Sequence, residues 1–294
     1  MVTDAGEPRP AATVIVARDR PSSTYEVLML LRNLKSDFVG GAYVFPGGGV
    51  DPHDSSDDAA SRCRDLDDAR ASSLLGLDFG GLSYWIACAR ELFEEAGLLL
   101  ATHEHGGPID MADPAVTARF EAHRRDVNDG TTRFIDVLAA ERLVLDTSAM
   151  CYFAHWITPV GPPRRYDTRF FVAAAPKDQV PVHDDKELVA NTWVTPAEAL
   201  ERHRRGEMQL ILPTIKNLEA IARFASCDEL LDAARRATAV PTIEPRIVAD
   251  GTGVRILLPG DDGYDEHSAA VRDVPAGSIA NTDINAASRE PQAT

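Results

Sequence analysis

Apolar residues in the first part of the chain occur in short runs that are separated by turn-forming residues. Residues 12–17 and 25–31 are two such runs, and the Pro-Ser-Ser turn between them predicts a pair of neighbouring strands. Further apolar runs predict strands at residues 98–101, 150–157, 169–175 and 188–194. Residues 241–258 are expected to form a terminal hairpin that turns at Asp250-Gly251.

Helical spacing is clearest over residues 83–96. At about 100° per residue, one stripe of this segment is apolar and comprises Trp85, Ala89, Leu92, Phe93 and Ala96. Gly97 stands where a left-handed C-terminal cap is expected. Other helices are predicted in parts of residues 51–78, 114–143 and 196–236, the last broken near Gly206 and Pro213. Strands interleaved with helices favour a mixed sheet covered on both faces.

The polar side of the segment 83–96 carries three carboxylates, from Glu91, Glu94 and Glu95. Like charges at these spacings repel one another along a helix, and only Arg90 offsets them there. An all-oxygen site suits Mg²⁺ or Mn²⁺ better than zinc. Taken alone, the cluster is also consistent with a solvated acidic helix face, which is the commoner case.

A second pattern, Phe45-Pro46-Gly47-Gly48-Gly49, precedes this helix. Consecutive glycines allow backbone conformations closed to other residues, and they let main-chain N–H groups approach an anion or a neighbouring helix. Asp51 and Asp54 follow the glycines and are either outer ligands of a metal site or turn formers.

Composition adds limits on partners and compartment. The chain has 294 residues and a formal net charge of −16, which argues against nucleic acid or an anionic membrane as a partner. Its four cysteines are scattered, and the N-terminus shows no secretory signal pattern, so a reduced, cytoplasmic protein is expected. No apolar run reaches the length of a membrane span.

These patterns together resemble the Nudix hydrolase family, whose box pairs a glycine and a glutamate with Arg-Glu-aliphatic-x-Glu-Glu-x-Gly-aliphatic. Residues 90–98 meet the second half of the box without exception. In the first half, which begins at Gly48, Asp54 stands in place of the family's glutamate, and the segment between Asp54 and Arg90 is far longer than usual. Such an insertion is similar to that of the peroxisomal-type coenzyme A diphosphatases of animals and their bacterial relatives.

The resemblance covers roughly residues 10–262 and implies an α/β fold, a Nudix-type α/β/α sandwich with a mixed central sheet and inserted helices. The helical insertions are expected at about 55–80 and 103–148, and residues 263–294 are expected to be a disordered tail. Homodimers are common in the family, so a homodimer is one expected state.

Site residues follow from the box and from its chemistry. Glu91 and Glu95 are predicted to bind the metal directly, with Glu94 binding a further ion or acting through water. Arg90 is expected to orient Glu94, and Glu187, in an acidic loop, is the candidate general base. The candidates for binding substrate are Arg32, Phe45, Gly47 and Gly48.

The resemblance implies a metal-dependent hydrolase of phosphoanhydride bonds in nucleoside diphosphate derivatives, with coenzyme A or acyl-coenzyme A as the leading substrates. The coenzyme A signature of such enzymes is matched at Arg32, Gly41 and residues 45–48. It is not matched at Leu30, Asn33 and Asp37. Two alternatives stay open: hydrolysis of NADH, ADP-ribose or dinucleoside polyphosphates, and a Nudix-like module that binds a nucleotide without cleaving it.

Overall fold

The structure, a computed structural model, describes residues 6–21, 24–34, 40–162, 164–182, 188–250 and 253–266. The predictions made for Asp37, for Glu187 and for the tail beyond residue 266 lie outside the described residues.

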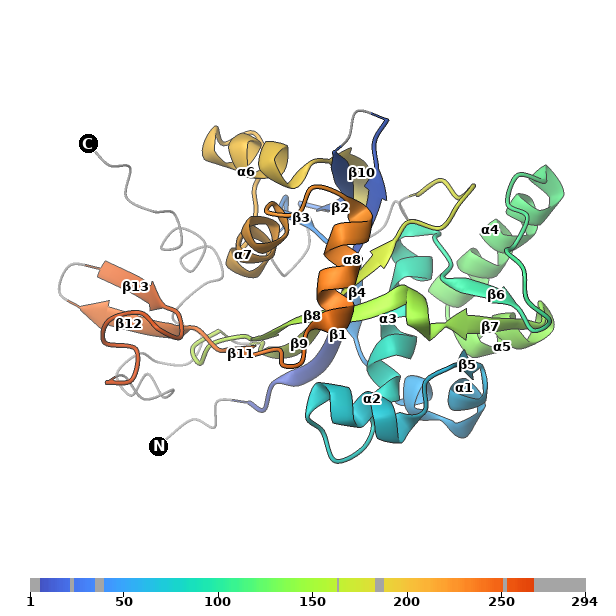
Figure 1. Cartoon of the computed structure of the whole chain (residues 1–294), viewed down its shortest axis with the longest axis horizontal. Coiled ribbons are helices and arrows are strands. Elements are labelled where there is room, and N and C mark those ends of the chain that lie inside the picture. The colour runs from blue at the N-terminus through green and yellow to red at the C-terminus, as the bar shows by residue number, and fades with distance from the viewer. Residues whose placement is uncertain are drawn as a thin grey trace.

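A mixed sheet forms the centre of the molecule, as predicted (Figure 1). Its hydrogen-bonded order is β10-β2-β1-β9-β8-β11, with β3 joined to β2 and β4 joined to β1. The strands run β1 Arg9–Asp19, β2 Tyr25–Arg32, β3 Tyr43–Val44, β4 Gly47–Gly49, β8 Met150–Ile157, β9 Tyr166–Ala174, β10 Leu188–Val194 and β11 Thr242–Ile243. The pairs β1–β9 and β8–β11 are parallel, whereas the other neighbours in this sheet are antiparallel.

Alternation along the strands explains why both faces of this sheet are covered. In β1, Val14 and Val16 point into one apolar core, while Ile15 and Ala17 point into a second core on the opposite face. All four side chains are fully buried, so each face needs a layer of helices against it.

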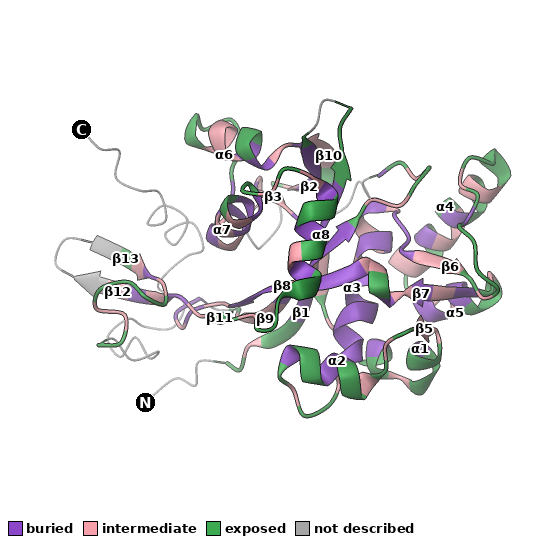
Figure 2. Cartoon of the chain, viewed as in Figure 1, coloured by how far each residue is buried: buried purple, intermediate pink, exposed green. Residues whose placement is uncertain are grey.

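The helices divide between these two faces (Figure 1). The first face carries η1 Pro52–Ser55, α1 Asp57–Ser61, α2 Asp68–Leu75, α3 Leu82–Ala96, α4 Pro114–Asn128 and α5 Phe134–Ala140. The second face carries α6 Pro196–Arg204, α7 Leu212–Ile221 and α8 Cys227–Arg236. Figure 2 shows α3 as the most completely buried helix, whereas the outer sides of α4, α6 and α8 are exposed. None of the described helices is long and apolar enough to cross a bilayer.

Three smaller strands form a separate sheet beside α5, in the order β5 Cys63–Arg64, β7 Leu143–Asp146 and β6 Ala101–His103. The sequence pattern predicts neither β5 nor β7. The prediction of a strand at residues 98–101 is wrong for all but its last residue, Ala101, where β6 begins. The backbone of Leu99 instead bonds to the Gln179 side chain. A short turn before Cys227, which the pattern does not predict either, separates α7 from α8.

The terminal hairpin is confirmed as β12 Arg246–Asp250 and β13 Gly253–Leu257, and it projects from one side of the molecule (Figure 1). The four cysteines are free thiols, and Cys88 and Cys151 lie in the core as expected. The domain limits at residues 10 and 262 stay predictions.

Candidate functional site

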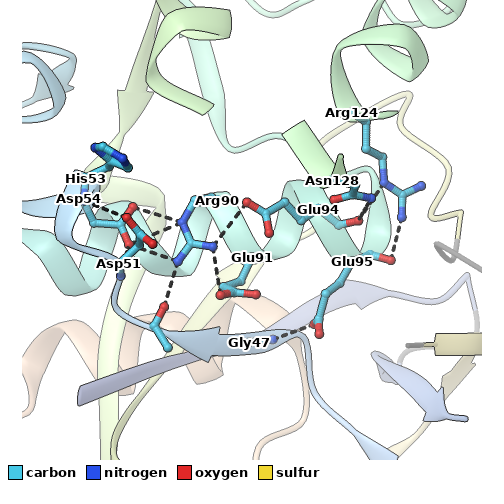
Figure 3. Close-up of polar contacts among 11 residues, drawn as sticks. Gly47, Asp51, His53, Asp54, Arg90, Glu91, Glu94, Glu95, Arg124 and Asn128 are labelled. Atoms are coloured by element: carbon cyan, nitrogen blue, oxygen red, sulfur yellow. Dashed lines mark hydrogen bonds and ion pairs between the residues drawn. The ribbon is translucent and has the colours of Figure 1, made fainter. Parts of the chain in front are cut away.

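The predicted acidic helix is α3, and its apolar stripe packs against β1 and the first core. Leu92 is fully buried and Phe93 nearly so, while Gly97 ends the helix in the left-handed conformation at φ 68°. The polar side of α3 faces the glycine strand β4, which places its glutamates beside that strand (Figure 3).

Strand β4 brings the glycine loop to the helix by pairing with the start of β1. The Gly47 N–H donates to Glu95 Oε2 at 2.8 Å, and a Cβ at Gly47 would meet the Ala12 carbonyl oxygen at 2.4 Å. A Cβ at Gly48 would lie 2.5 Å from Glu91 Oε1. Gly47 is therefore required by its close approach to the backbone of the neighbouring strand, whereas Gly48 leaves room for the Glu91 carboxylate in its present position.

Arg90 is the centre of the charged network in this site (Figure 3). Its Nη1 donates to Glu91 Oε1 at 2.9 Å and to Glu94 Oε1 at 3.2 Å, so the predicted contact with Glu94 is present. Its Nη2 also donates to the Gly49 carbonyl at 2.8 Å. One guanidinium thus joins two glutamates of the helix to the glycine strand.

Asp54 completes the network from the other side. Arg90 Nε and Nη2 each donate to an Asp54 carboxylate oxygen at 3.0 Å, which is a two-pronged pair. Only 3% of Asp54 is exposed. Asp51, the cap of η1, accepts from the His53 N–H, and Asp54 in turn accepts from the Asp51 N–H. The two aspartates are therefore turn formers, and Asp54 also orients Arg90.

Burial makes the negative charge of these carboxylates costly. Burial is the largest cause that raises the pKa of Glu91, to about 7, and it also raises the pKa of Glu94. For Arg90, burial alone lowers the pKa, but the hydrogen bonds to Asp54 and the charges of Glu91, Asp54 and Glu94 raise it overall, so the guanidinium stays charged. The site contains more negative charge, on one buried and three half-buried carboxylates, than its single arginine offsets.

The donor set fits a hard divalent cation in its chemistry. Glu91, Glu94 and Glu95 offer oxygen ligands only, within one and a half turns of one helix. Among the described residues, however, no three acidic, histidine or cysteine side chains converge closely enough to hold a metal as they stand. Glu91 and Glu94 are directed to Arg90, and Glu95 is directed to Gly47 (Figure 3). Binding of a cation would therefore require these side chains to exchange partners.

The other candidate residues lie in different settings. Phe45 is 3% exposed and packs in the second core, so its side chain anchors the glycine loop and presents no surface to a ligand. Arg32 is half-buried at the end of β2, where its backbone pairs with residues 41 and 42. Glu187 lies outside the described residues.

Two residues that the sequence does not single out also contact this helix. Arg124 and Asn128 of α4 donate to the backbone carbonyls of Glu94 and Glu95 (Figure 3). Their helix is mostly polar, and its sequence shows no motif that marks these positions.

Comparison with known proteins identifies the family of the chain. The sequence model of a family described as the NUDT19 Nudix domain matches residues 79–221. The chain is 30% identical over 305 residues to the acyl-coenzyme A diphosphatase NUDT19 of Gallus gallus, covering 88% of this chain and 80% of that one. It is 29% identical over 276 residues to the protein of the same name from Xenopus laevis, covering 83% of this chain and 73% of that one.

A crystal structure of a NUDIX hydrolase from Alicyclobacillus acidocaldarius is similar in fold. The TM-score is 0.62 at 26% sequence identity, and the match covers 77% of this chain and 96% of the other. The shared sheet, the complete second half of the box and the similarity along most of the chain lead to one conclusion. The chain belongs to the Nudix hydrolase family, in its NUDT19 branch, and is an enzyme of the class that acts on acid anhydrides.

Proposed function

We propose that this enzyme hydrolyses the phosphoanhydride bond of coenzyme A or of an acyl-coenzyme A, with Mg²⁺ or Mn²⁺ held by Glu91, Glu94 and Glu95. The observation that supports this most directly is the set of half-buried carboxylates on α3, two of which lie against the glycine strand and which Arg90 neutralises only in part. The acyl-coenzyme A diphosphatases that resemble the chain supply the substrate class.

A phosphoanhydride resists water because its phosphates are negatively charged and water is a weak nucleophile. A divalent cation, when bound, neutralises phosphate oxygens and lowers the pKa of a bound water. In the proposed reaction, the oxygen of water forms a new bond to phosphorus and the bridging P–O bond breaks. The products are 3′-phosphorylated AMP and 4′-phosphopantetheine, or its acylated form.

The protein's own residues hold this site in shape. Arg90 donates to both Glu91 and Glu94 and so holds these two carboxylates on the same side of α3. The Gly47 N–H donates to Glu95 Oε2 and fixes this carboxylate beside the glycine strand β4. We assign the general base to Glu187 and a phosphate contact to Arg32, and both assignments stay predictions.

Coenzyme A is preferred over NADH, ADP-ribose and dinucleoside polyphosphates because the named relatives act on acyl-coenzyme A. The partial match of the coenzyme A signature is the reason to test the alternatives directly. A panel with all these compounds, assayed for Mg²⁺- or Mn²⁺-dependent release of AMP-type products, ranks them by kcat/KM. A higher kcat/KM for NADH or ADP-ribose than for coenzyme A and its thioesters would overturn the substrate assignment.

The decisive variant is Glu95→Gln, which keeps the size and removes the charge. We expect kcat for coenzyme A to fall by at least about 10²-fold, the scale of losing a charged group that acts in the transition state. Glu121→Gln, on the exposed side of α4, is the matched control and should leave kcat unchanged. Equal turnover in Glu95→Gln and Glu121→Gln, both folded, would refute the proposed site.

Two further predictions concern the whole molecule. The cytoplasmic location inferred from the scattered cysteines stays a prediction that fractionation of expressing cells measures. The homodimer is likewise tested by light scattering of the purified chain, in which a monomer mass would exclude it.

A further inference from the structure

The carboxyl end of α3 is held by parts of the chain that lie far away in the sequence. The last four carbonyls of a helix lack partners within it. Here the Phe93 carbonyl accepts from the Gly97 N–H at 3.0 Å, and the Ala96 carbonyl accepts from the Val182 N–H at 2.9 Å. The two carbonyls between them, of Glu94 and Glu95, belong to glutamates of the carboxylate site.

The inserted helix α4 supplies the donors for these two carbonyls (Figure 3). Arg124 Nε donates to the Glu94 carbonyl at 2.9 Å, and Arg124 Nη2 donates to the Glu95 carbonyl at 2.8 Å. Asn128 Nδ2 adds a bond to the Glu94 carbonyl at 3.2 Å. The planar fork of one guanidinium therefore spans two adjacent peptide groups.

Electrostatics explains why this end of α3 needs such a partner. A helix carries partial negative charge at its carboxyl end, where cations stabilise and anions destabilise. The last turn of α3 holds no basic residue but contains Glu94 and Glu95. Arg124 brings the missing positive charge from outside the helix, and since the residue is only 9% exposed, that charge is little screened by water.

The approach of Arg124 depends on the cap residue of α3. A Cβ on Gly97 would lie 3.3 Å from Arg124 Nη1, so glycine there permits both the left-handed turn and the passage of the guanidinium. Phe120, on the preceding turn of α4, is buried in the first core and fixes the helix that carries Arg124. The inserted helix α4 thus contacts α3 at its last turn, through Arg124.

We propose that Arg124 is a positioning residue for the reaction: through the backbone of Glu94 and Glu95 it fixes the last turn of α3, and with it the carboxylates that bind the metal. This inference rests on the proposed function, because it gives the inserted helix a role in placing the proposed ligands. Without the hydrogen bonds from Arg124, the last turn of α3 frays, and the backbone positions of Glu94 and Glu95 are no longer fixed relative to each other.

The test compares Arg124→Met with Arg125→Met, which removes the same charge from the neighbouring, exposed position of α4. Mn²⁺ binding is measured by electron paramagnetic resonance without substrate, and kcat and KM are measured with coenzyme A. We expect Arg124→Met to weaken Mn²⁺ binding and to lower kcat by about tenfold each, the low end for groups that orient metal ligands. KM should change little, and Arg125→Met should match the wild type.

Two milder variants serve if Arg124→Met does not fold. Arg124→Lys keeps the charge but cannot span both carbonyls, and Asn128→Ala removes one bond to the Glu94 carbonyl. Each should lower kcat and Mn²⁺ affinity at a temperature where the protein is fully folded. Wild-type kcat and Mn²⁺ affinity in the folded variants, with only the unfolding midpoint reduced, would show that Arg124 merely caps the helix and would overturn the proposal.

The two proposals fail in different ways. If the wild type binds no Mn²⁺, or binds it equally after Glu95→Gln, the proposed function fails. If the wild type binds Mn²⁺ through Glu95 and Arg124→Met binds it just as well, only the role of Arg124 fails.

Discussion

Two arginines, the half-buried Arg90 and the buried Arg124, serve the same helix α3 in opposite ways. Arg90 belongs to α3 itself, and its charged partners are the side chains of Asp54, Glu91 and Glu94. Arg124 comes from the insertion, and the partners described above are backbone carbonyls of the last turn. One arginine therefore organises the charged surface of the helix, and the other secures its end.

The difference suggests how the proposed metal site combines side chains that can move with a backbone that is held in place. Carboxylate side chains can rotate from an arginine to an incoming cation, and they can take up protons. Backbone carbonyls do neither, so the framework from which Glu94 and Glu95 extend does not change when their partners do. The experiments below test this division of roles, in order of decreasing effect.

The largest effect is expected for Arg90→Met. This variant leaves Asp54, which is 3% exposed, without its guanidinium, and removing one partner of a buried ion pair costs about 3–5 kcal/mol. Urea unfolding in the presence of EDTA measures the free energy of unfolding without any contribution from metal. The double variant Arg90→Met/Asp54→Asn should recover part of the loss. A loss below about 1 kcal/mol would mean that the network around Arg90 contributes little to the fold.

The two glycines of β4 give the next comparison. Gly47→Ala places a methyl group against the backbone of β1, at 2.4 Å from the Ala12 carbonyl oxygen, and should cost about 1–3 kcal/mol of stability. Gly48→Ala meets only the end of the Glu91 side chain, which can move away. We expect Gly48→Ala to lower kcat by about tenfold with little loss of stability, because Glu91, a proposed metal ligand, would lose its orientation. The opposite ranking of the two variants in urea unfolding would contradict this assignment.

The smallest effect expected is a change in the pH dependence of stability, and it comes from the pair of Asp167 with a third arginine, Arg169, outside the carboxylate site. Asp167 pairs with Arg169 and accepts a contact from His155 Nε2 at 2.5 Å. Burial alone raises the pKa of Asp167, but these hydrogen bonds lower it below its usual value. A lowered carboxyl pKa stabilises the fold above the pKa of the unfolded chain, and this stabilisation is lost as pH falls through the folded pKa.

Asp167→Asn should therefore cost about 1 kcal/mol at pH 7, a modest value because the side chain is 26% exposed, and less near pH 3. Urea unfolding at both pH values measures this difference. Ile15→Val is the control, since it removes only a buried methylene group that does not titrate, and its effect on stability should stay the same at both pH values. A cost of Asp167→Asn that does not shrink in acid would contradict the pKa shift.

Much of this architecture is predictable from local pattern. The alternation in β1 and β2, the strands β8 and β10 and the helix α3 follow from periodicities of two and 3.6 residues. The short strands β5 and β7 do not, because their two and four residues are too few to show a periodicity. They form only through pairing, with β7 between β5 and β6. The contact between Arg90 and Glu94 was also predictable, since the two residues are four positions apart on one helix.

The sequence by itself determined the acidic helix, its glycine loop and the family to which both belong, because those features depend on residues close together in the chain. Only the tertiary structure decided that Asp54 holds Arg90 across a long insertion, that Phe45 is buried, and that Arg124 caps the helix from the inserted α4. These are contacts between distant segments. They form where packing brings a donor to a buried carboxylate or to a helix-end carbonyl without a partner in its own helix. The spacing of residues along the chain does not predict such contacts.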